Sequence, residues 1–150
     1  MKQVVIDTNV LISATLSPLG KPAHIMSLVS FKELQLYYCE DILDEYKRAL
    51  AYKRLKIPVS AQNKAIAGIA KLGVLVSPPT ASTIAMPDES DRIFYDIAQA
   101  NNAFLITGNT KHFPAKSTII TPADFWEYDF KEANDNFITP VRMDKPPKYK

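Results

Sequence analysis

Three carboxylates that lie far apart in the sequence are the residues of this chain best suited to chemistry. Asp7 directly follows a short apolar run, Glu45 lies beside apolar residues at helical spacing, and Asp91 stands near the start of another amphipathic segment. Inward-facing carboxylates are costly and raise one another's pKa unless a cation neutralises them. Bound Mg²⁺ or Mn²⁺ would remove that cost and would lower the pKa of a water for attack on phosphorus.

Each of these acids also has an ordinary structural explanation. Asp7 could cap the helix that follows it. Glu45 could be an exposed helix residue that pairs with Arg48, three residues later. Asp91 could interact with a helix dipole in the first turn of its helix, where Asp88 is expected mainly as the cap and only secondarily as support for the acids.

The elements that must position these acids alternate between strands and helices. Apolar residues at helical spacing predict helices after Asp7 and at about 22–31, 40–52, 60–71 (with Ser60 as the cap), 88–101 and 122–128. Apolar runs predict buried strands at 3–6, 34–39, 74–76, 103–106 and 118–120. Because most of these runs are continuous, we expect an α/β fold with a central, mostly parallel sheet of about five strands flanked by helices.

Polar residues that follow strands of such a sheet deserve inspection, because ligands bind beyond the carboxyl ends of parallel strands. Asp7-Thr8-Asn9 follows the first predicted strand, and Thr107-Gly108-Asn109 follows the strand at 103–106. We therefore expect both segments at one edge of the sheet. His24 and His112 lack ligand spacing with each other or with Cys39, and we expect them to be structural.

Length and composition indicate one globular domain in a cytoplasmic protein. The 150 residues suffice for a single core, which we place at residues 1–128. Residues 129–150 contain three prolines and a basic end, and we expect a loosely ordered or partner-binding tail there. No apolar run is long enough for a membrane helix, the N-terminus does not fit a secretory leader, and a lone Cys39 rules out an internal disulfide.

The net charge of +2 neither requires nor excludes a nucleic-acid partner. Its local distribution says more, because basic residues cluster at the end of one predicted helix. Such a cluster suits contact with RNA phosphates. A solvated helix end whose basic side chains complement the helix dipole would explain it equally. The residues concerned are Lys47, Arg48, Lys53 and Arg54.

Four segments, taken in order, resemble the motifs of PIN-domain ribonucleases, in particular the VapC-like branch of type II toxin-antitoxin toxins. The resemblance covers residues 1 to about 128. The segments are Asp7-Thr8-Asn9-Val10-Leu11-Ile12, Ile42-Leu43-Asp44-Glu45, Asp88-Glu89-Ser90-Asp91 followed by Phe94, and Thr107-Gly108-Asn109 before His112-Phe113-Pro114.

The resemblance implies that Asp7, Glu45 and Asp91 are the catalytic acids and bind Mg²⁺ or Mn²⁺. Asn9 and Thr107 would orient the acids or the attacking water. Many members of the family carry a fourth acid where this chain has Asn109, whose carbonyl can still serve as a neutral metal ligand. The implied protein is a homodimeric, metal-dependent endoribonuclease that acts on single-stranded RNA or an exposed RNA loop and is held inactive by a protein antitoxin.

Other functions remain to be weighed against this hypothesis. Asn109 motivates one alternative, a weakly active or inactive PIN fold that binds RNA or a protein without cutting. A phosphatase of the aspartyl-phosphate type would need a second Asp at position 9, where this chain has Asn9. A dinucleotide-binding enzyme would need clustered glycines after its first strand, and the four glycines form no such cluster.

Overall fold

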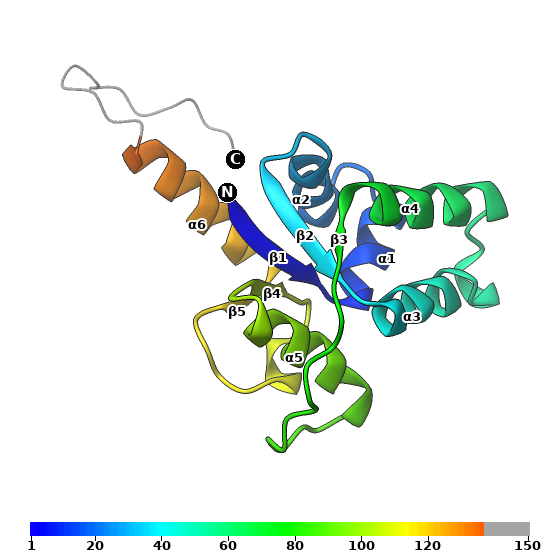
Figure 1. Cartoon of the computed structure of the whole chain (residues 1–150). Coiled ribbons are helices and arrows are strands. Elements are labelled where there is room, and N and C mark those ends of the chain that lie inside the picture. The colour runs from blue at the N-terminus through cyan, green and yellow to red at the C-terminus, as the bar shows by residue number, and fades with distance from the viewer. Residues whose placement is uncertain (137–150) are drawn as a thin grey trace.

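The computed structural model describes residues 1–136 and contains a five-stranded parallel sheet flanked by helices (Figure 1). The order across the sheet is β3-β2-β1-β4-β5, and every pair of neighbours is parallel. The predicted α/β architecture is therefore confirmed, and the first strand of the chain is the central one. The strands are β1 (Lys2–Ile6), β2 (Leu34–Tyr38), β3 (Val74–Leu75), β4 (Phe104–Ile106) and β5 (Ile119–Ile120).

Six α-helices and three short 3₁₀ helices connect these strands within residues 1–136. Helix α5 packs on β1, β2 and β4, whereas α2 packs on β2 and is contacted by α1 and α6. No helix in this part of the chain is long and apolar enough to cross a membrane. The helices are α1 (Thr8–Leu16), α2 (Lys21–Ser30), α3 (Glu40–Leu50), η1 (Lys53–Leu55), α4 (Val59–Leu72), η2 (Glu89–Asp91), α5 (Arg92–Ala100), η3 (Thr110–His112) and α6 (Pro122–Asn136).

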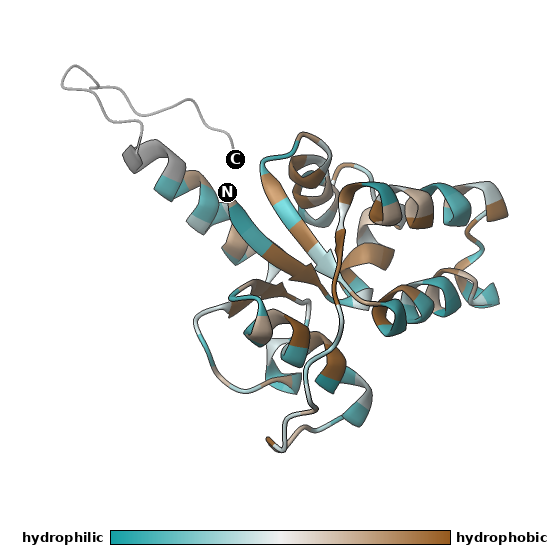
Figure 2. Ribbon diagram, viewed as in Figure 1, coloured by the Kyte–Doolittle hydropathy of each residue, from teal (hydrophilic) through white to brown (hydrophobic). Residues whose placement is uncertain are grey.

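The central strand is buried on both faces, and this burial fixes its end. Val4, Val5 and Ile6 have no exposed surface, and Val4 pairs with Leu36 on one side and Phe104 on the other. Burying each such side chain stabilises the fold by roughly 1.5–3 kcal/mol. Figure 2 shows β1 hydrophilic at its start and hydrophobic toward its carboxyl end. The residue that follows Ile6 is therefore held at a defined place beside the core.

The structure corrects two expectations in the middle of the chain. The strand predicted at 74–76 is not buried, because β3 is an edge strand of the sheet. Val74 is 37% exposed and Leu75 is 54% exposed. Helix α4 begins at Val59 with Pro58 in the cap position, so Ser60 is not its cap. Three apolar residues in a row therefore did not distinguish an edge strand from a central one.

The last helix is longer than predicted. It continues past residue 128 to Asn136, so the predicted tail begins inside a helix. Lys2 at the start of β1 pairs with Asp129 at 2.8 Å and also with Glu132, and these ion pairs hold the additional turns against the sheet. The remaining residues of the predicted tail, 137–150, lie outside the described residues.

Candidate active site

The three predicted acids meet in one pocket. Asp7, Glu45 and Asp91 line a cavity of about 480 Å³, together with Asp88 and His112. Asp7 comes from the end of β1, Glu45 from α3 and Asp91 from η2. The fold therefore brings together acids from three separate parts of the sequence, beside the carboxyl end of the central strand.

Asp7 is the buried acid of this pocket, with 7% of its surface exposed. Its Oδ1 accepts a hydrogen bond from the Thr8 backbone N at 2.8 Å, and its Oδ2 accepts one from Thr107 Oγ1 at 2.7 Å. Burial raises the pKa of Asp7, and these two hydrogen bonds act in the opposite direction. Asp7 thus caps α1, which is the structural role that its position in the sequence suggests, and it also lines the pocket.

Glu45 reaches the pocket because its neighbour Tyr46 fastens α3 to β1. The Tyr46 hydroxyl is fully buried and donates a hydrogen bond to the carbonyl oxygen of Ile6, the residue before Asp7. Burial raises the pKa of Tyr46, so the hydroxyl keeps the proton that it donates. Glu45 Oε1 also accepts a hydrogen bond from Arg48 Nη2 at 2.8 Å, so the pairing predicted from their spacing of three residues is present.

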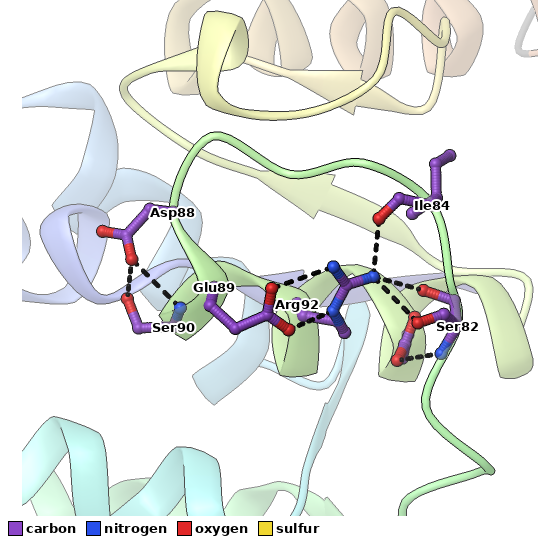
Figure 3. A network of polar contacts seen from close by, with 7 residues as sticks. Ser82, Ile84, Asp88, Glu89, Ser90 and Arg92 are labelled. Carbon is purple, nitrogen blue, oxygen red and sulfur yellow. Dashed lines mark hydrogen bonds and ion pairs between the residues drawn. The ribbon is translucent and has the colours of Figure 1, made fainter.

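Asp91 is placed by a short turn and not by the helix itself. Asp88 caps this turn, because its Oδ1 accepts hydrogen bonds from Ser90 N at 3.0 Å and Ser90 Oγ at 2.9 Å (Figure 3). Asp91 then occupies the N-cap position of α5, so the expectation that it lies within the first turn of that helix is wrong. The chain forms the 3₁₀ turn η2 before α5 begins, which turns the Asp91 carboxylate into the pocket.

A partly buried polar network holds the loop that leads to Asp91, and the sequence alone did not indicate it. The Arg92 guanidinium donates to the carbonyl oxygens of Ser82 at 2.9 Å and Ile84 at 2.7 Å, and it pairs with Glu89 (Figure 3). The buried Asp96 accepts a hydrogen bond from Ser82 N at 3.0 Å. Together these contacts tie the loop to α5, so the position of η2 depends on residues that never touch the pocket.

Asp91 is the acid that a bound cation would stabilise most. Its side chain is only 16% exposed, and its Oδ2 is buried without a hydrogen-bond partner. Burial, and then the charges of Asp7 and Asp88, raise the pKa of Asp91 to about 6. An unpartnered carboxylate oxygen beside other carboxylates is a natural ligand for a hard divalent cation.

The pocket nevertheless does not form a finished metal site. Among residues 1–136, no group of three His, Cys, Asp or Glu side chains is arranged to hold a metal ion. The oxygen donors fit Mg²⁺ or Mn²⁺ in kind, because these ions favour carboxylate and carbonyl oxygen. Side-chain movement would be needed to bring the third acid into direct contact with an ion held by the other two.

His112 lines the pocket on the side of β4, whereas Asn109 does not line it. The Asn109 Nδ2 atom contacts His112 Nε2 at 2.9 Å. His112 Nδ1 lies 3.5 Å from Asp91 Oδ2. We expected His112 to be structural, and the structure places it in the lining of the acid pocket. Its lack of ligand spacing in the sequence concealed this contact.

The supporting residues join the two polar segments that follow β1 and β4. Asn9 Oδ1 accepts a hydrogen bond from Gly108 N at 3.1 Å, and Thr107 Oγ1, besides donating to Asp7, accepts one from Asn109 N at 3.0 Å. Thr107 has no exposed surface. The segments Asp7-Thr8-Asn9 and Thr107-Gly108-Asn109 are therefore joined directly by hydrogen bonds.

The predicted RNA-binding residues lie outside this pocket. Lys47 and Arg48 occupy the last turn of α3, and Lys53 and Arg54 belong to η1. All four are exposed. Of these side chains, only Arg48 contacts a pocket residue, through its bond to Glu45.

Comparisons with known proteins agree with this fold and with the resemblance. A model of the PIN domain family matches residues 3–111. An uncharacterised protein of Methanocaldococcus jannaschii is 31% identical over 110 residues, which are 71% of this chain and 70% of the relative. A chain from the crystal structure of VapBC2 from Rickettsia felis, bound to a DNA fragment from its promoter, has a similar fold with a TM-score of 0.55 and 15% identity. The match covers 73% of this chain and 89% of that chain.

Replacing Asp91 with Asn is expected to stabilise the metal-free protein near neutral pH. The pKa of Asp91 is about 6 in the folded protein and about 3.9 in an unfolded chain. The folded wild type therefore binds the proton more tightly and loses stability as the pH rises from about 4 through about 6. Thermal unfolding midpoints should show Asp91→Asn above the wild type at about pH 7.5, and the gap should be about half as large at about pH 5 and nearly closed by about pH 4.

Divalent metal is expected to reverse this order. Mn²⁺ at about a hundred times its Kd should stabilise the wild type by about 2.7 kcal/mol and stabilise Asp91→Asn much less. Asp44→Asn is the matched control, because Asp44 is an exposed acid on α3 that does not line the pocket. An Asp91→Asn variant that behaves like Asp44→Asn, both with and without Mn²⁺, would contradict this account of the pocket.

Proposed function

We infer that this chain, which belongs to the PIN domain family, is a metal-dependent endoribonuclease. The observation that carries the proposal is the buried, unpartnered oxygen of Asp91, which lines one pocket with Asp7 and Glu45. Within residues 1–136 that oxygen accepts no hydrogen bond, and its one polar contact is with His112 Nδ1 at 3.5 Å, which is too long for a hydrogen bond. A cation would supply the missing partner and would also bring the chemistry that phosphodiester hydrolysis needs.

In this proposal Asp7 and Asp91 hold the ion, Glu45 completes the set, and the Asn109 carbonyl is an additional neutral ligand. When bound, Mg²⁺ or Mn²⁺ lowers the pKa of a water and neutralises charge that develops on the phosphate oxygens. Thr107 keeps Asp7 in a fixed orientation through its 2.7 Å hydrogen bond. Because Asp7 is buried and doubly hydrogen bonded, it anchors the site, whereas Glu45 is the acid that adjusts.

Glu45 can move toward an ion at little cost. Its partner Arg48 is 71% exposed, and surface pairs at this helical spacing contribute only about 0.3–0.5 kcal/mol. Repulsion from Asp7 and Asp91 favours the outward pairing when no cation is present. We therefore propose that Glu45 exchanges Arg48 for the metal, which accounts for a pocket that contains the acids without a finished ligand set.

The reaction assigned to these residues is hydrolysis of single-stranded RNA. Attack by a metal-activated water requires no covalent nucleophile from the protein, and the Ser90 hydroxyl in the pocket is already bonded to Asp88 as part of the turn η2. Asp7, Asp91 and Glu45 would orient that water through the ion, and Asn9 and Thr107 would support them through the hydrogen bonds between the two polar segments. Asp88 would contribute by capping η2 and so positioning Asp91.

Purified protein with Mg²⁺ or Mn²⁺ should cleave single-stranded RNA, and Asp7→Asn and Asp91→Asn should each remove nearly all activity. Loss of a ligand carboxylate should lower the rate by more than the roughly 10- to 100-fold that loss of an outer-shell partner costs. The assay uses total cellular RNA with mapped product ends, so it reports reaction and substrate together. Asp44→Asn serves as the matched control on α3, and unchanged cleavage in both site variants would refute the proposal.

A second candidate function is a PIN fold that binds RNA or a regulatory protein without cutting. Asn109 favours it, because an amide in place of an acid lowers the negative charge that holds a metal, and its NH₂ group already contacts His112. Metal-dependent RNA binding without cleavage, under every metal and RNA tried, would favour this function over hydrolysis.

We also propose that the protein is a cytoplasmic, homodimeric toxin restrained by a protein antitoxin. The support is the resemblance of the motifs and the similar fold of a chain from the VapBC2 complex. A free ribonuclease that acts on cellular RNA would be harmful, which gives a restraining partner its purpose. Total charge and composition neither support nor oppose this part of the proposal.

Expression of the wild-type chain in a bacterial host should arrest growth, and expression of Asp7→Asn at the same level should not. Co-expression with the product of a small open reading frame immediately upstream of the gene should restore growth to the wild type. Growth that is unaffected by an expressed, cleavage-competent wild-type chain would contradict the toxin proposal while leaving the nuclease proposal intact.

A further inference from the structure

A second cavity lies beside the acid pocket, and its charge is of the opposite sign. It has a volume of about 520 Å³, and its lining includes Lys111 and Lys116 but no acidic residue. Both lysines are exposed, and neither takes part in an ion pair within the part of the chain that the structure describes. Their charges are therefore available to an anionic ligand.

The loop that carries these lysines is tied to the acid pocket by a continuous series of contacts. Asp7 accepts from Thr107, Thr107 accepts from the Asn109 backbone, and the Asn109 amide contacts His112. His112 faces Asp91 from η3, and Lys111 is its neighbour in the same turn. The next residue along, Phe113, is buried. The turn η3 thus presents His112 to the acids and Lys111 to the second cavity.

The sheet order places this loop opposite the basic residues that were predicted from the sequence. Strand β1, which ends at Asp7, lies between β2 and β4. Helix α3, with Lys47 and Arg48 in its last turn, follows β2, whereas the lysine loop follows β4. Figure 1 shows α3 and the segment after β4 on different sides of the end of β1. Positive charge therefore flanks the acid pocket on both sides.

An RNA strand needs this flanking charge because the pocket itself repels it. Four acids and His112 line the acid pocket, and no lysine or arginine does. A single divalent ion offsets only part of the charge of Asp7, Glu45, Asp88 and Asp91. Lysines beyond the pocket can bind neighbouring phosphates without pairing with the catalytic acids.

We propose that Lys111 and Lys116 bind phosphates of single-stranded RNA on the β4 side of the acid pocket, so that the strand crosses the pocket between two basic flanks. The proposal rests on the proposed nuclease function and specifies how its substrate lies. Neither Lys111 nor Lys116 belongs to the segments that resemble the family's motifs, so their role in RNA binding is an additional assignment.

The test measures binding separately from cleavage. A short fluorescent single-stranded RNA of mixed sequence is titrated with the full chain in EDTA, which prevents metal-dependent hydrolysis, over a series of salt concentrations. The double variant Lys111→Ala/Lys116→Ala should bind about tenfold more weakly. Its slope of log K against log salt should be shallower by about 1.4, because each contact with a single-strand phosphate contributes roughly 0.7.

The matched control is Lys64→Ala/Lys71→Ala, which removes the same charge from exposed positions on α4. Neither control lysine lines the acid pocket or the lysine cavity. The control should keep the wild-type affinity and salt slope. Thermal unfolding of both double variants checks that the fold is retained, since all four side chains are exposed.

The outcomes separate this proposal from the nuclease proposal. Weaker binding by the Lys111/Lys116 variant alone, with a higher KM and an unchanged kcat in Mn²⁺, supports the RNA path. Equal losses in both double variants, no loss in either, or no RNA binding by the wild type would overturn it. Lysine-dependent binding by a wild-type chain that never cleaves RNA would overturn hydrolysis and leave the binding proposal standing.

Discussion

The hydrogen bond between the buried Asp7 carboxylate and the buried Thr107 hydroxyl is the contact on which the rest of the site depends. It joins the ends of β1 and β4 at the centre of the sheet, where Thr107 has no exposed surface and Asp7 has only 7%. A buried acid without such a partner would be expensive. The core that buries Val4, Val5 and Ile6 therefore also determines where Asp7 stands, and every other site residue is positioned relative to it.

Two further anchors bring the remaining acids to that point. The Tyr46 hydroxyl binds the carbonyl of Ile6 and sets α3 beside Asp7, while Arg92 holds the loop that leads to Asp91. Both anchors bond to backbone carbonyl oxygens, so they fix the chain path without occupying the pocket. The resulting cluster of acids is unfavourable by itself, because burial first and the neighbouring carboxylates second raise the pKa of Asp91. A divalent cation would relieve this repulsion and would convert it into binding energy.

Much of the fold could be predicted from the sequence because continuous apolar runs and helical spacing are local signals. The run before Asp7 and the amphipathic pattern of Ile42, Tyr46 and Leu50 identified β1 and α3 correctly. The exposure of the edge strand β3 and the full length of α6 could not be predicted, because both depend on residues far away in the sequence. Exposure of Val74 reflects its place in the strand order, and the extension of α6 is held by Lys2.

The same distinction applies to the site. Acids at strand and helix ends indicated a pocket, and Asp7, Glu45 and Asp91 do line one. The contact between His112 and Asp91 was not predicted, because it forms only when η3, which follows β4, lies against η2 in the folded chain. The roles of Arg92 and Asp96 also escaped sequence reasoning, since charged residues on a helix are usually solvated and these two bind a loop instead.

A crystal structure of the wild-type protein grown with saturating Mn²⁺, with the metal located by its anomalous scattering, tests the central claim most directly. The account predicts a Mn²⁺ ion in direct contact with oxygens of Asp7 and Asp91, with Glu45 turned away from Arg48 toward the ion. Mn²⁺ bound only elsewhere on the protein, with the Asp91 oxygen still unpartnered at saturating metal, would contradict it.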